Sequence, residues 1–263
     1  MGEDYCAFAE ELAAAAGRVA LEYFRRPLKV DDKAAGVPGK EFDPVTEADR
    51  AAERLMREMI AARYPDHGIA GEEFADTNAG AELVWVLDPI DGTKSFLSGF
   101  PLWGTLIGLM ERGRPVLGLM SQPFTGEIFV GWGGKARYRG PAGARDLKTR
   151  ACGDLAAALL TTTSPQLIED ASDQARYRAL EEKVRLARYG GDCYGYCMLA
   201  DGQIDLVAET GLKLHDIAVL IPIIEGAGGV ISDWQGGTPN KGGRILASGC
   251  PSLHEAALEI LNS

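Results

Sequence analysis

The stretch that most constrains how this chain can fold is LVWVLDPIDGTKSF, residues 83–96. Its first five residues form an apolar run typical of a buried β-strand, and the run ends abruptly at two carboxylates, Asp88 and Asp91. Pro89 fixes its own φ angle, so we expect a Pro-Ile turn between the two acids, directly after a strand over residues 83–87. The segment therefore predicts a buried strand that carries a pair of carboxylates at its end.

The pattern in the first half of the chain predicts further helices and strands. Hydrophobic periodicity indicates an amphipathic helix over residues 4–25 and a second helix over residues 46–64. Residues 30–44 contain two prolines and two glycines, which is typical of a loop. Residues 103–130 predict three strands of a β-meander.

The second half alternates strands and helices more regularly. Strands are expected over residues 158–164, 184–189, 204–209, 228–233 and 244–248, and helices over 169–183, 192–201, around Asp216, and from Ser252 onward. Residues 137–154 are rich in glycine, proline and charge. We therefore expect them to separate an N-terminal α+β half (about 1–145) from a C-terminal α/β half (about 146–263) of one domain.

Composition narrows the class of function. The formal net charge is -11, the opposite of what a protein needs to neutralise nucleic-acid phosphates. The five cysteines form no C-x-x-C pair, which argues against both a disulfide framework and a structural zinc site. The sequence shows neither a secretory signal nor an apolar run that could span a bilayer, so we expect a cytoplasmic protein without membrane or nucleic-acid partners. An acidic chain that handles an anionic substrate needs local cations, which bound metal ions supply.

Carboxylates stand where regular elements stop: Asp49 in DPVTEAD, Glu72 and Glu73 in GEEF, Asp88 with Asp91, and Asp216 in KLHDIAV. Carboxylates gathered at strand ends repel one another unless cations are present. Mg²⁺ resolves this conflict because it takes oxygen ligands and usually keeps waters and substrate phosphate oxygens. The Ile90 carbonyl is a further oxygen, and Gly92 with Thr93 offers backbone N–H groups to a phosphate at an expected helix N-terminus.

Each of these residues also has a purely structural interpretation. The two aspartates of DPID could line a solvated turn, and Glu72 could be surface charge. Asp49 could be the N3 partner of Thr46 in a helix capping box, and Asp216 could be a helix N-terminal acid that interacts with the dipole. His215 is interpreted as a packing or surface residue, since oxygen-rich Mg²⁺ sites rarely recruit imidazole. Taken one by one, the residues leave both interpretations open.

Taken together, the motifs resemble the inositol monophosphatase superfamily of Mg²⁺-dependent, lithium-sensitive phosphatases. The resemblance covers nearly the whole chain in the family order: DPVTEAD, GEE, DPIDGTKSF and, near the C-terminus, GLKLHDIAVLIPIIEGAGG. It implies a layered α/β fold, the five-layer α/β/α/β/α sandwich of that superfamily, and a homodimer. It also implies hydrolysis of a small phosphorylated metabolite by in-line attack of an activated water, without a covalent enzyme intermediate and with about two to three Mg²⁺ ions per active site.

The resemblance also assigns roles to the matching residues. Glu72, Asp88, the Ile90 carbonyl, Asp91 and Asp216 are implied as metal ligands, Gly92 and Thr93 as phosphate contacts, Asp216 also as a substrate contact, and Asp49, Glu72 and Thr93 as the catalytic groups that orient and deprotonate the attacking water. Many members of the superfamily have a lysine a few residues before the DPVT-type segment. Either Lys33 or Lys40 could take that place here, and VDDK is the closer local match.

A finer resemblance is to histidinol-phosphate phosphatases of the inositol-monophosphatase type. The matching stretches are DPIDGTKSFLSGFPLWGTLIGL and GGDCYGYCMLADGQIDLVAETGLKLHDIAVLIPIIEGAGG. Inositol-specific relatives tend instead to have an Asn-Phe pair and, at the position of Asp192, a small neutral residue. Histidinol phosphate carries an ammonium group and an imidazole, so Asp192 and Glu209 would supply a negative pocket beside the phosphate site. Asp192 could otherwise cap the helix that is expected to begin there.

These arguments predict a Mg²⁺-dependent phosphomonoesterase that hydrolyses histidinol phosphate to histidinol and phosphate, a step of histidine biosynthesis. An inositol-1-phosphate phosphatase or a broad-specificity small-molecule phosphatase is the alternative within the same class. A catalytically idle metal-binding or partner-binding relative is a third hypothesis, and the complete set of matching site residues argues against it.

Overall fold

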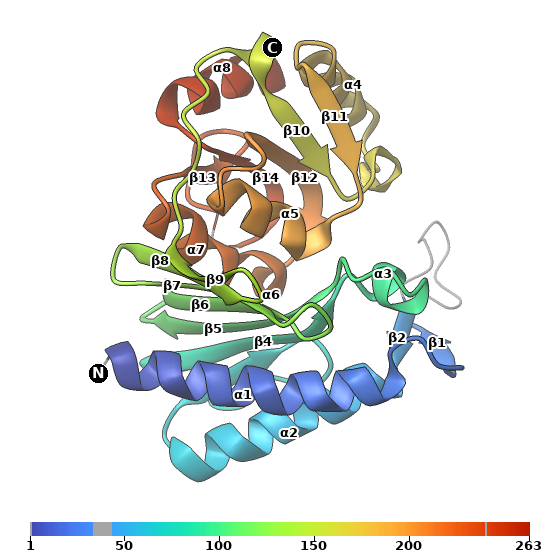
Figure 1. Ribbon diagram of the computed structural model, residues 1–263, viewed down its shortest axis with the longest axis vertical. Helices are drawn as coiled ribbons and strands as arrows, with labels where there is room; N and C mark the ends of the chain where they lie inside the picture. The colour runs from blue at the N-terminus through green and yellow to red at the C-terminus, as the bar shows by residue number, and fades with distance from the viewer. Residues whose placement is uncertain (1, 34–43, 240) are drawn as a thin grey trace.

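The computed structural model describes residues 2–33, 44–239 and 241–263, and two large β-sheets dominate it (Figure 1). The helices are α1 (Gly2–Tyr23), α2 (Glu47–Arg63), α3 (Thr93–Leu97), α4 (Ala171–Glu181), α5 (Asp192–Ala200), α6 (Leu214–Ile217), α7 (Leu220–Gly226) and α8 (Pro251–Leu261). The strands are β1 (Val30–Asp32), β2 (Pro44–Thr46), β3 (Gly68–Gly71), β4 (Leu83–Asp91), β5 (Gly104–Glu111), β6 (Arg114–Gln122), β7 (Glu127–Trp132), β8 (Lys135–Gly140), β9 (Gly143–Asp146), β10 (Leu159–Thr162), β11 (Leu186–Tyr189), β12 (Leu206–Leu212), β13 (Val230–Asp233) and β14 (Gly243–Ser248). Short 3-10 helices cover Leu155–Ala157 and Pro165–Leu167.

The first large sheet has the strand order β3-β4-β5-β6-β7-β8-β9 and is antiparallel except for the parallel pair β3–β4. The three strands predicted within residues 103–130 are present as β5, β6 and β7, each paired with the next. Successive side chains of a strand point to opposite faces. In β5, Leu106 packs with α5 and α7, whereas Ile107 packs with α1 and α2. The sheet is therefore buried on both faces.

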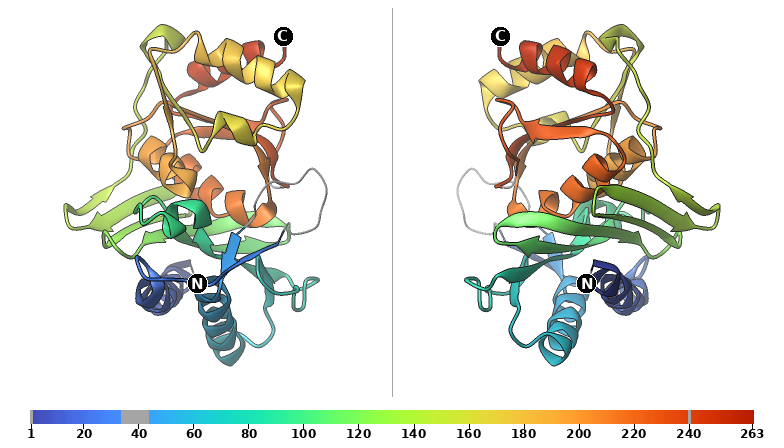
Figure 2. Two further views of the ribbon diagram at one scale, coloured as in Figure 1. Left: turned by 90° about the vertical axis from the view of Figure 1, so that its right-hand side faces the viewer. Right: turned by 90° about the vertical axis from the view of Figure 1, so that its left-hand side faces the viewer.

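The second large sheet has the strand order β11-β10-β12-β14-β13, with β10 parallel to both of its neighbours and the other pairs antiparallel. Its central strand β12 is also buried on both faces. Leu206 and Ala208 pack with α4 and α8, and Val207 between them packs with α5 and α7. Figure 2 shows α4 and α8 outside this sheet, and α1 and α2 outside the first sheet.

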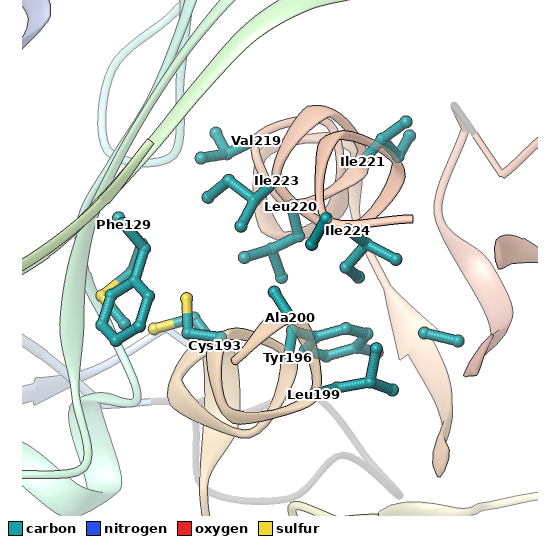
Figure 3. Close-up of a cluster of buried hydrophobic side chains, with 14 of the residues drawn as sticks. Phe129, Cys193, Tyr196, Leu199, Ala200, Val219, Leu220, Ile221, Ile223 and Ile224 are labelled. Atoms are coloured by element: carbon teal, nitrogen blue, oxygen red, sulfur yellow. The ribbon is translucent and has the colours of Figure 1, made fainter. Parts of the chain in front are cut away.

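Helices α5 and α7 fill the space between the two sheets. Figure 3 shows Tyr196 and Ala200 of α5 facing Leu220 and Ile224 of α7 in one buried cluster. Helix α7 approaches the first sheet closely at Gly118, where any β-carbon would overlap the backbone carbonyl at the start of this helix. Glycine is required at that position because backbone and helix touch directly.

The layers follow one another as α1 with α2, the first sheet, the central helices, the second sheet, and α4 with α8. This order confirms the predicted five-layer α/β/α/β/α sandwich. The first sheet ends at Asp146 and the second begins at Leu159, whereas the division of the domain into two halves stays a prediction. None of the helices in the described part of the chain is long and apolar enough to cross a membrane.

The structure corrects three predictions of local structure. Strand β4 does not stop at residue 87 but continues to Asp91. Residues 30–44 are not simply a loop, because their two ends pair as β1 and β2, while residues 34–43 lie outside the described part. Residues 137–154 do not all separate the two sheets, because residues 137–146 belong to the hairpin of β8 and β9, which extends the first sheet.

His254 ties α8 to the second sheet as a buried imidazole. Its Nε2 lies 2.8 Å from the Ser232 hydroxyl, and its Nδ1 lies 2.9 Å from the Ser248 hydroxyl. Burial lowers the pKa of His254 from 6.5 to about 4. Between these pH values the unfolded chain binds a proton that the folded chain does not, so this contribution to stability is complete above pH 6.5 and is lost as the pH falls toward 4.

We expect the free energy of unfolding of the wild type to fall by about 2.5 kcal/mol more than that of His254→Gln between about pH 7 and about pH 4.5. The variant lacks the group that titrates in this interval. Chemical denaturation at a series of pH values measures the difference. Parallel pH profiles for the two proteins would show that His254 is protonated as readily in the folded chain as in the unfolded one.

Candidate active site

A β-bulge in β4 brings Asp88 and Asp91 together. Between these two residues β4 advances by three positions while its partner β5 advances by two, from Leu106 to Gly104. Side chains three positions apart in a regular strand point to opposite faces, and the extra residue turns both aspartates to the same side. Pro89 occupies the bulge, where no ladder hydrogen bond is required of it. The Pro-Ile step is therefore part of a bulged strand rather than a turn after it.

The third carboxylate, Asp216, comes from the second half of the chain. The helix predicted around it is divided into α6 and α7. Asp216 lies in the first turn of α6, and its Oδ2 accepts the Lys213 backbone N–H at 2.7 Å, as expected of a capping acid. The same side chain also joins a cluster, because one carboxylate oxygen each from Asp88, Asp91 and Asp216 lie within 4.8 Å of one another.

Burial and mutual repulsion make this cluster unfavourable without a cation. Burial raises the pKa of Asp88 well above its ordinary value, and the charges of Glu72 and Asp91 raise it further. Burial likewise raises the pKa of Asp91, with added repulsion from Asp192 and Asp216. A hard divalent ion would remove the repulsion, and oxygens are the ligands it prefers. The donor set therefore fits Mg²⁺.

Glu72 lies beside the cluster, directly after β3, and Lys33 contacts it. The Lys33 Nζ donates to Glu72 Oε1 at 2.9 Å and to Glu73 Oε1 at 2.6 Å. Burial raises the pKa of Glu72, but the charge and the hydrogen bond of Lys33, together with the charges of His215 and Lys213, bring the pKa below its ordinary value. Burial raises the pKa of Glu73 to about 7. Of the two candidate lysines, Lys33 therefore contacts the acidic residues of the site. Lys40 lies outside the described residues.

An ion pair on α2 holds the loop that carries Glu72. Glu53 Oε2 accepts the Glu73 backbone N–H at 2.8 Å, and Glu53 Oε1 accepts the Arg57 Nε–H at 2.7 Å. Arg57 also donates to the carbonyls of the two residues that follow Glu73, at 3.0 and 3.1 Å. Glu53 and Arg57 are not among the predicted site residues, although a spacing of four on a helix is typical of an ion pair.

Asp49 forms the capping box that its spacing from Thr46 suggests. Its Oδ2 accepts the Thr46 backbone N–H at 2.8 Å and the Thr46 hydroxyl at 2.6 Å. Burial raises the pKa of Asp49, the hydrogen bonds from Thr46 lower it, and the charge of Glu72 raises it again, so the net shift is upward. Asp49 therefore takes part in the cap of α2, and the charge of Glu72 in the candidate site acts on its carboxylate.

The Ile90 carbonyl, on the bulged strand, accepts a hydrogen bond from the Thr93 hydroxyl at 3.1 Å.

The bulge leads through Gly92 directly into the short helix α3. Gly92 has a φ of +83°, in the left-handed region that favours glycine, and α3 begins at Thr93. The helix start expected for the phosphate contacts is therefore present. The Cys193 backbone N–H, at the start of α5, donates to Asp91 Oδ2 at 2.7 Å. This bond attaches the central helix layer to the end of the bulged strand.

A cavity of about 690 Å³ opens beside the cluster, and Asp192 lies in its wall. Asp192 is the first residue of α5 and Gly191 before it is the N-cap, so the interpretation of Asp192 as the cap is wrong. Its Oδ2 accepts the Ser95 hydroxyl at 2.9 Å. Burial raises the pKa of Asp192, while hydrogen bonds from Ser95 and Thr163 and the charge of Lys94 oppose the rise.

Glu209 also lines this cavity, but its carboxylate is 5% exposed and both oxygens have protein partners. Oε1 accepts the Thr163 backbone N–H at 2.7 Å, and Oε2 accepts the Tyr196 hydroxyl at 2.9 Å. Burial raises its pKa. Thr163 and Tyr196 are not among the predicted site residues. One contribution of Thr163 is its backbone N–H, which leaves no mark in a sequence motif.

Known proteins are similar to this chain in sequence and in fold. Residues 2–263 match the family model described as the inositol monophosphatase family. The chain is 41% identical to the bifunctional phosphatase IMPL2, chloroplastic, of Arabidopsis thaliana, over 98% of this chain and 75% of that protein. It is 36% identical to a histidinol-phosphatase of Chlorobaculum parvum, over 86% of this chain and 84% of that protein. A solved structure of an inositol monophosphatase from Zymomonas mobilis matches with a TM-score of 0.86 at 40% identity, covering 99% of this chain and 98% of the other.

Proposed function

The chain belongs to the inositol monophosphatase family, and from this premise we propose that it hydrolyses histidinol phosphate to histidinol and inorganic phosphate. Family membership makes it a phosphoric monoester hydrolase that acts on small phosphorylated substrates and depends on a metal, typically Mg²⁺. The identity of the substrate and the roles of single residues are the proposed part.

The acidic cluster supports the assignment of the metal ligands. Asp88, Asp91 and Asp216 would hold about two to three Mg²⁺ ions, together with Glu72 and the Ile90 carbonyl. When bound, the metal supplies positive charge that stabilises the phosphoryl oxygens and makes a water molecule more acidic.

Residues of the chain would orient the water and the phosphate. Asp49, Glu72 and Thr93 are proposed to position the water and take its proton, and the raised pKa of Asp49 suits a general base. The backbone N–H groups of Gly92 and Thr93 would bind phosphate oxygens, since glycine lets a ligand approach the backbone closely. The reaction is then a direct displacement by water.

The observation that carries the substrate assignment is the carboxylate of Asp192 in the cavity wall. It is partly buried, it does not cap α5, and hydroxyl partners favour its ionised form. A partly buried carboxylate beside a phosphate site is suited to a substrate that carries an ammonium group. Relatives named histidinol-phosphatase support the same assignment. Glu209 would add negative charge to the same wall.

Replacing Asp192 with asparagine tests this assignment. Asparagine keeps the volume and tolerates the φ of +46° found at this position, where alanine would be strained. We expect kcat/KM for histidinol phosphate to fall about 10- to 150-fold, because a charge-assisted hydrogen bond contributes roughly 1.5–3 kcal/mol. Hydrolysis of p-nitrophenyl phosphate, which has no amine, should hardly change. Equal losses on both substrates would mean that Asp192 supports the fold rather than recognising an amine.

An inositol phosphate is the competing substrate, because the similar structure from Zymomonas mobilis is titled an inositol monophosphatase. Measuring kcat/KM for histidinol phosphate, inositol-1-phosphate, adenosine bisphosphate and fructose bisphosphate separates the candidates. A preference for inositol-1-phosphate would overturn the substrate assignment and leave the metal chemistry standing. The homodimer implied by the sequence resemblance stays a prediction, which light scattering tests directly.

A further inference from the structure

Ser95 and Asp192 meet in the site although 97 positions separate them in the chain. The Ser95 hydroxyl donates to Asp192 Oδ2 at 2.9 Å. Ser95 belongs to α3, which follows the loop of Gly92 and Thr93, and Asp192 opens α5 in the central helix layer. The bond therefore joins the candidate phosphate loop to the wall of the cavity.

The backbone of Asp192 is held in an uncommon conformation. Its φ of +46° lies in the left-handed region, which is uncommon for residues other than glycine, although asparagine and aspartate adopt it more often than most. Such conformations persist where the surroundings fix them. The N-cap of α5 is Gly191, so Asp192 is not the capping residue of that helix. The effect of the conformation is to direct the carboxylate toward Ser95 and the cavity.

The Asp192 carboxylate lies directly against Gly92. A β-carbon on Gly92 would be 3.0 Å from Asp192 Oδ2, which is tighter than ordinary van der Waals contact. A cation held by Asp192 would therefore lie next to a phosphate bound at Gly92, and not at the far end of the cavity. In histidinol phosphate the ammonium group stands on the carbon adjacent to the ester carbon, whereas the imidazole extends away from it.

We propose that Ser95 and Asp192 form a binding pair for an ammonium group on the carbon next to the ester carbon, with Ser95 as the residue that positions the Asp192 carboxylate. This inference rests on the proposed function and narrows it. The favoured class of substrate becomes phosphate esters that carry an amine on the carbon next to the ester carbon. An ammonium donates to the carboxylate as a charged donor, so both partners of the hydrogen bond are ionised, whereas a hydroxyl in the same place is a neutral donor. The imidazole of histidinol phosphate then contributes less to the choice of substrate than the amine does.

A pair of small substrates isolates the amine from the imidazole. The wild-type enzyme, saturated with Mg²⁺, is assayed for phosphate release from 2-aminoethyl phosphate and from 2-hydroxyethyl phosphate, which match in size. We expect kcat/KM to favour the amine by about 10-fold or more. A ratio near one overturns the ammonium pair, even if histidinol phosphate is still preferred to inositol-1-phosphate.

Variants of Ser95 test its positioning role. Ser95→Ala should lower the ratio of amine to hydroxyl substrate about fivefold and leave p-nitrophenyl phosphate nearly unchanged, since the carboxylate loses the donor that orients it. Ser95→Thr keeps the hydroxyl and should restore the ratio. Ser98→Ala, the matched control, removes an exposed hydroxyl just after α3 and should change neither value.

The combination of variants shows whether the two residues act together. Once Asp192→Asn has removed the charge, Ser95→Ala should lower the ratio no further, because the two residues serve one interaction. An equal loss on every substrate in Ser95→Ala, without rescue by threonine, would reduce Ser95 to a structural residue. The proposed function fails by a different result, a wild-type preference for inositol-1-phosphate over histidinol phosphate.

Discussion

Asparagine in place of Asp91 should abolish phosphatase activity, with kcat/KM reduced by at least about 10³-fold, while the fold is retained. Asp91 is one of three carboxylates whose oxygens lie within 4.8 Å of one another, and the substitution removes a charge proposed to hold the metal. An amide oxygen can still accept the Cys193 N–H that Asp91 accepts at 2.7 Å. Helix α5 should therefore keep its attachment to the bulged strand.

Metal-dependent stability separates the loss of chemistry from a folding defect. In chelator the variant should be at least as stable as the wild type, because burial and neighbouring charges raise the pKa of Asp91 and the variant lacks this charge. Added Mg²⁺ should raise the Tm of the wild type, since a ligand that binds the folded state stabilises it. The same addition should change the Tm of Asp91→Asn much less. EDTA should inactivate the wild type, and Mg²⁺ should restore it.

Asp66→Asn is the matched control, because it makes the same chemical change at an exposed aspartate after α2. It should keep both full activity and the stabilisation by Mg²⁺. Full turnover of Asp91→Asn, or of the wild type in chelator, would contradict the metal mechanism. A variant that unfolds at a much lower temperature than the wild type in chelator would instead show that Asp91 is needed for the fold.

The sequence predicted those features that depend on local periodicity and on motif. Alternating apolar residues located β5, β6 and β7, and helical periodicity located α1, α2 and α5 to within a few residues. Because β4 is apolar and ends in acids, the position of the acidic cluster followed from the same pattern. The layered fold followed from the motif resemblance, since periodicity alone does not determine how sheets and helices stack.

Features that depend on pairing between distant segments could not be predicted. The bulge between Asp88 and Asp91 exists only relative to β5, so the same residues suggested a turn when considered alone. The contacts of Asp192 with Ser95 and of Asp91 with the Cys193 N–H span 97 and 102 positions. Strands β1 and β2 are three residues each, too short to show a period.

Asp49 shows a different limit, because the structure confirms its capping role while its catalytic role stays a prediction. It accepts the N–H and the hydroxyl of Thr46 through one oxygen, which is the capping box. It is also buried within range of the charge of Glu72, as expected for a residue that handles the attacking water. The spacing of Thr46 and Asp49 in the sequence predicts the capping role, but it gives no information about the catalytic one.

Asp49→Asn should separate these roles, with kcat reduced by roughly 10²-fold or more at a nearly unchanged KM. The amide oxygen can still accept both hydrogen bonds from Thr46, so stability should change by less than about 1 kcal/mol. The amide cannot take a proton from water, so the chemical step slows. The Mg²⁺ concentration needed for half-maximal activity should stay within a few-fold of the wild-type value, because Asp49 is not a proposed ligand.

Thr46→Ala is the converse variant, because it removes the capping hydroxyl and keeps the carboxylate. Its loss should cost about 1 kcal/mol of stability, with turnover reduced far less than in Asp49→Asn. Steady-state kinetics measures kcat of each variant, and chemical denaturation measures the free energy of unfolding of each. Near-normal turnover of Asp49→Asn would make Asp49 a helix cap alone, and the proton of the attacking water would then have to pass to Glu72.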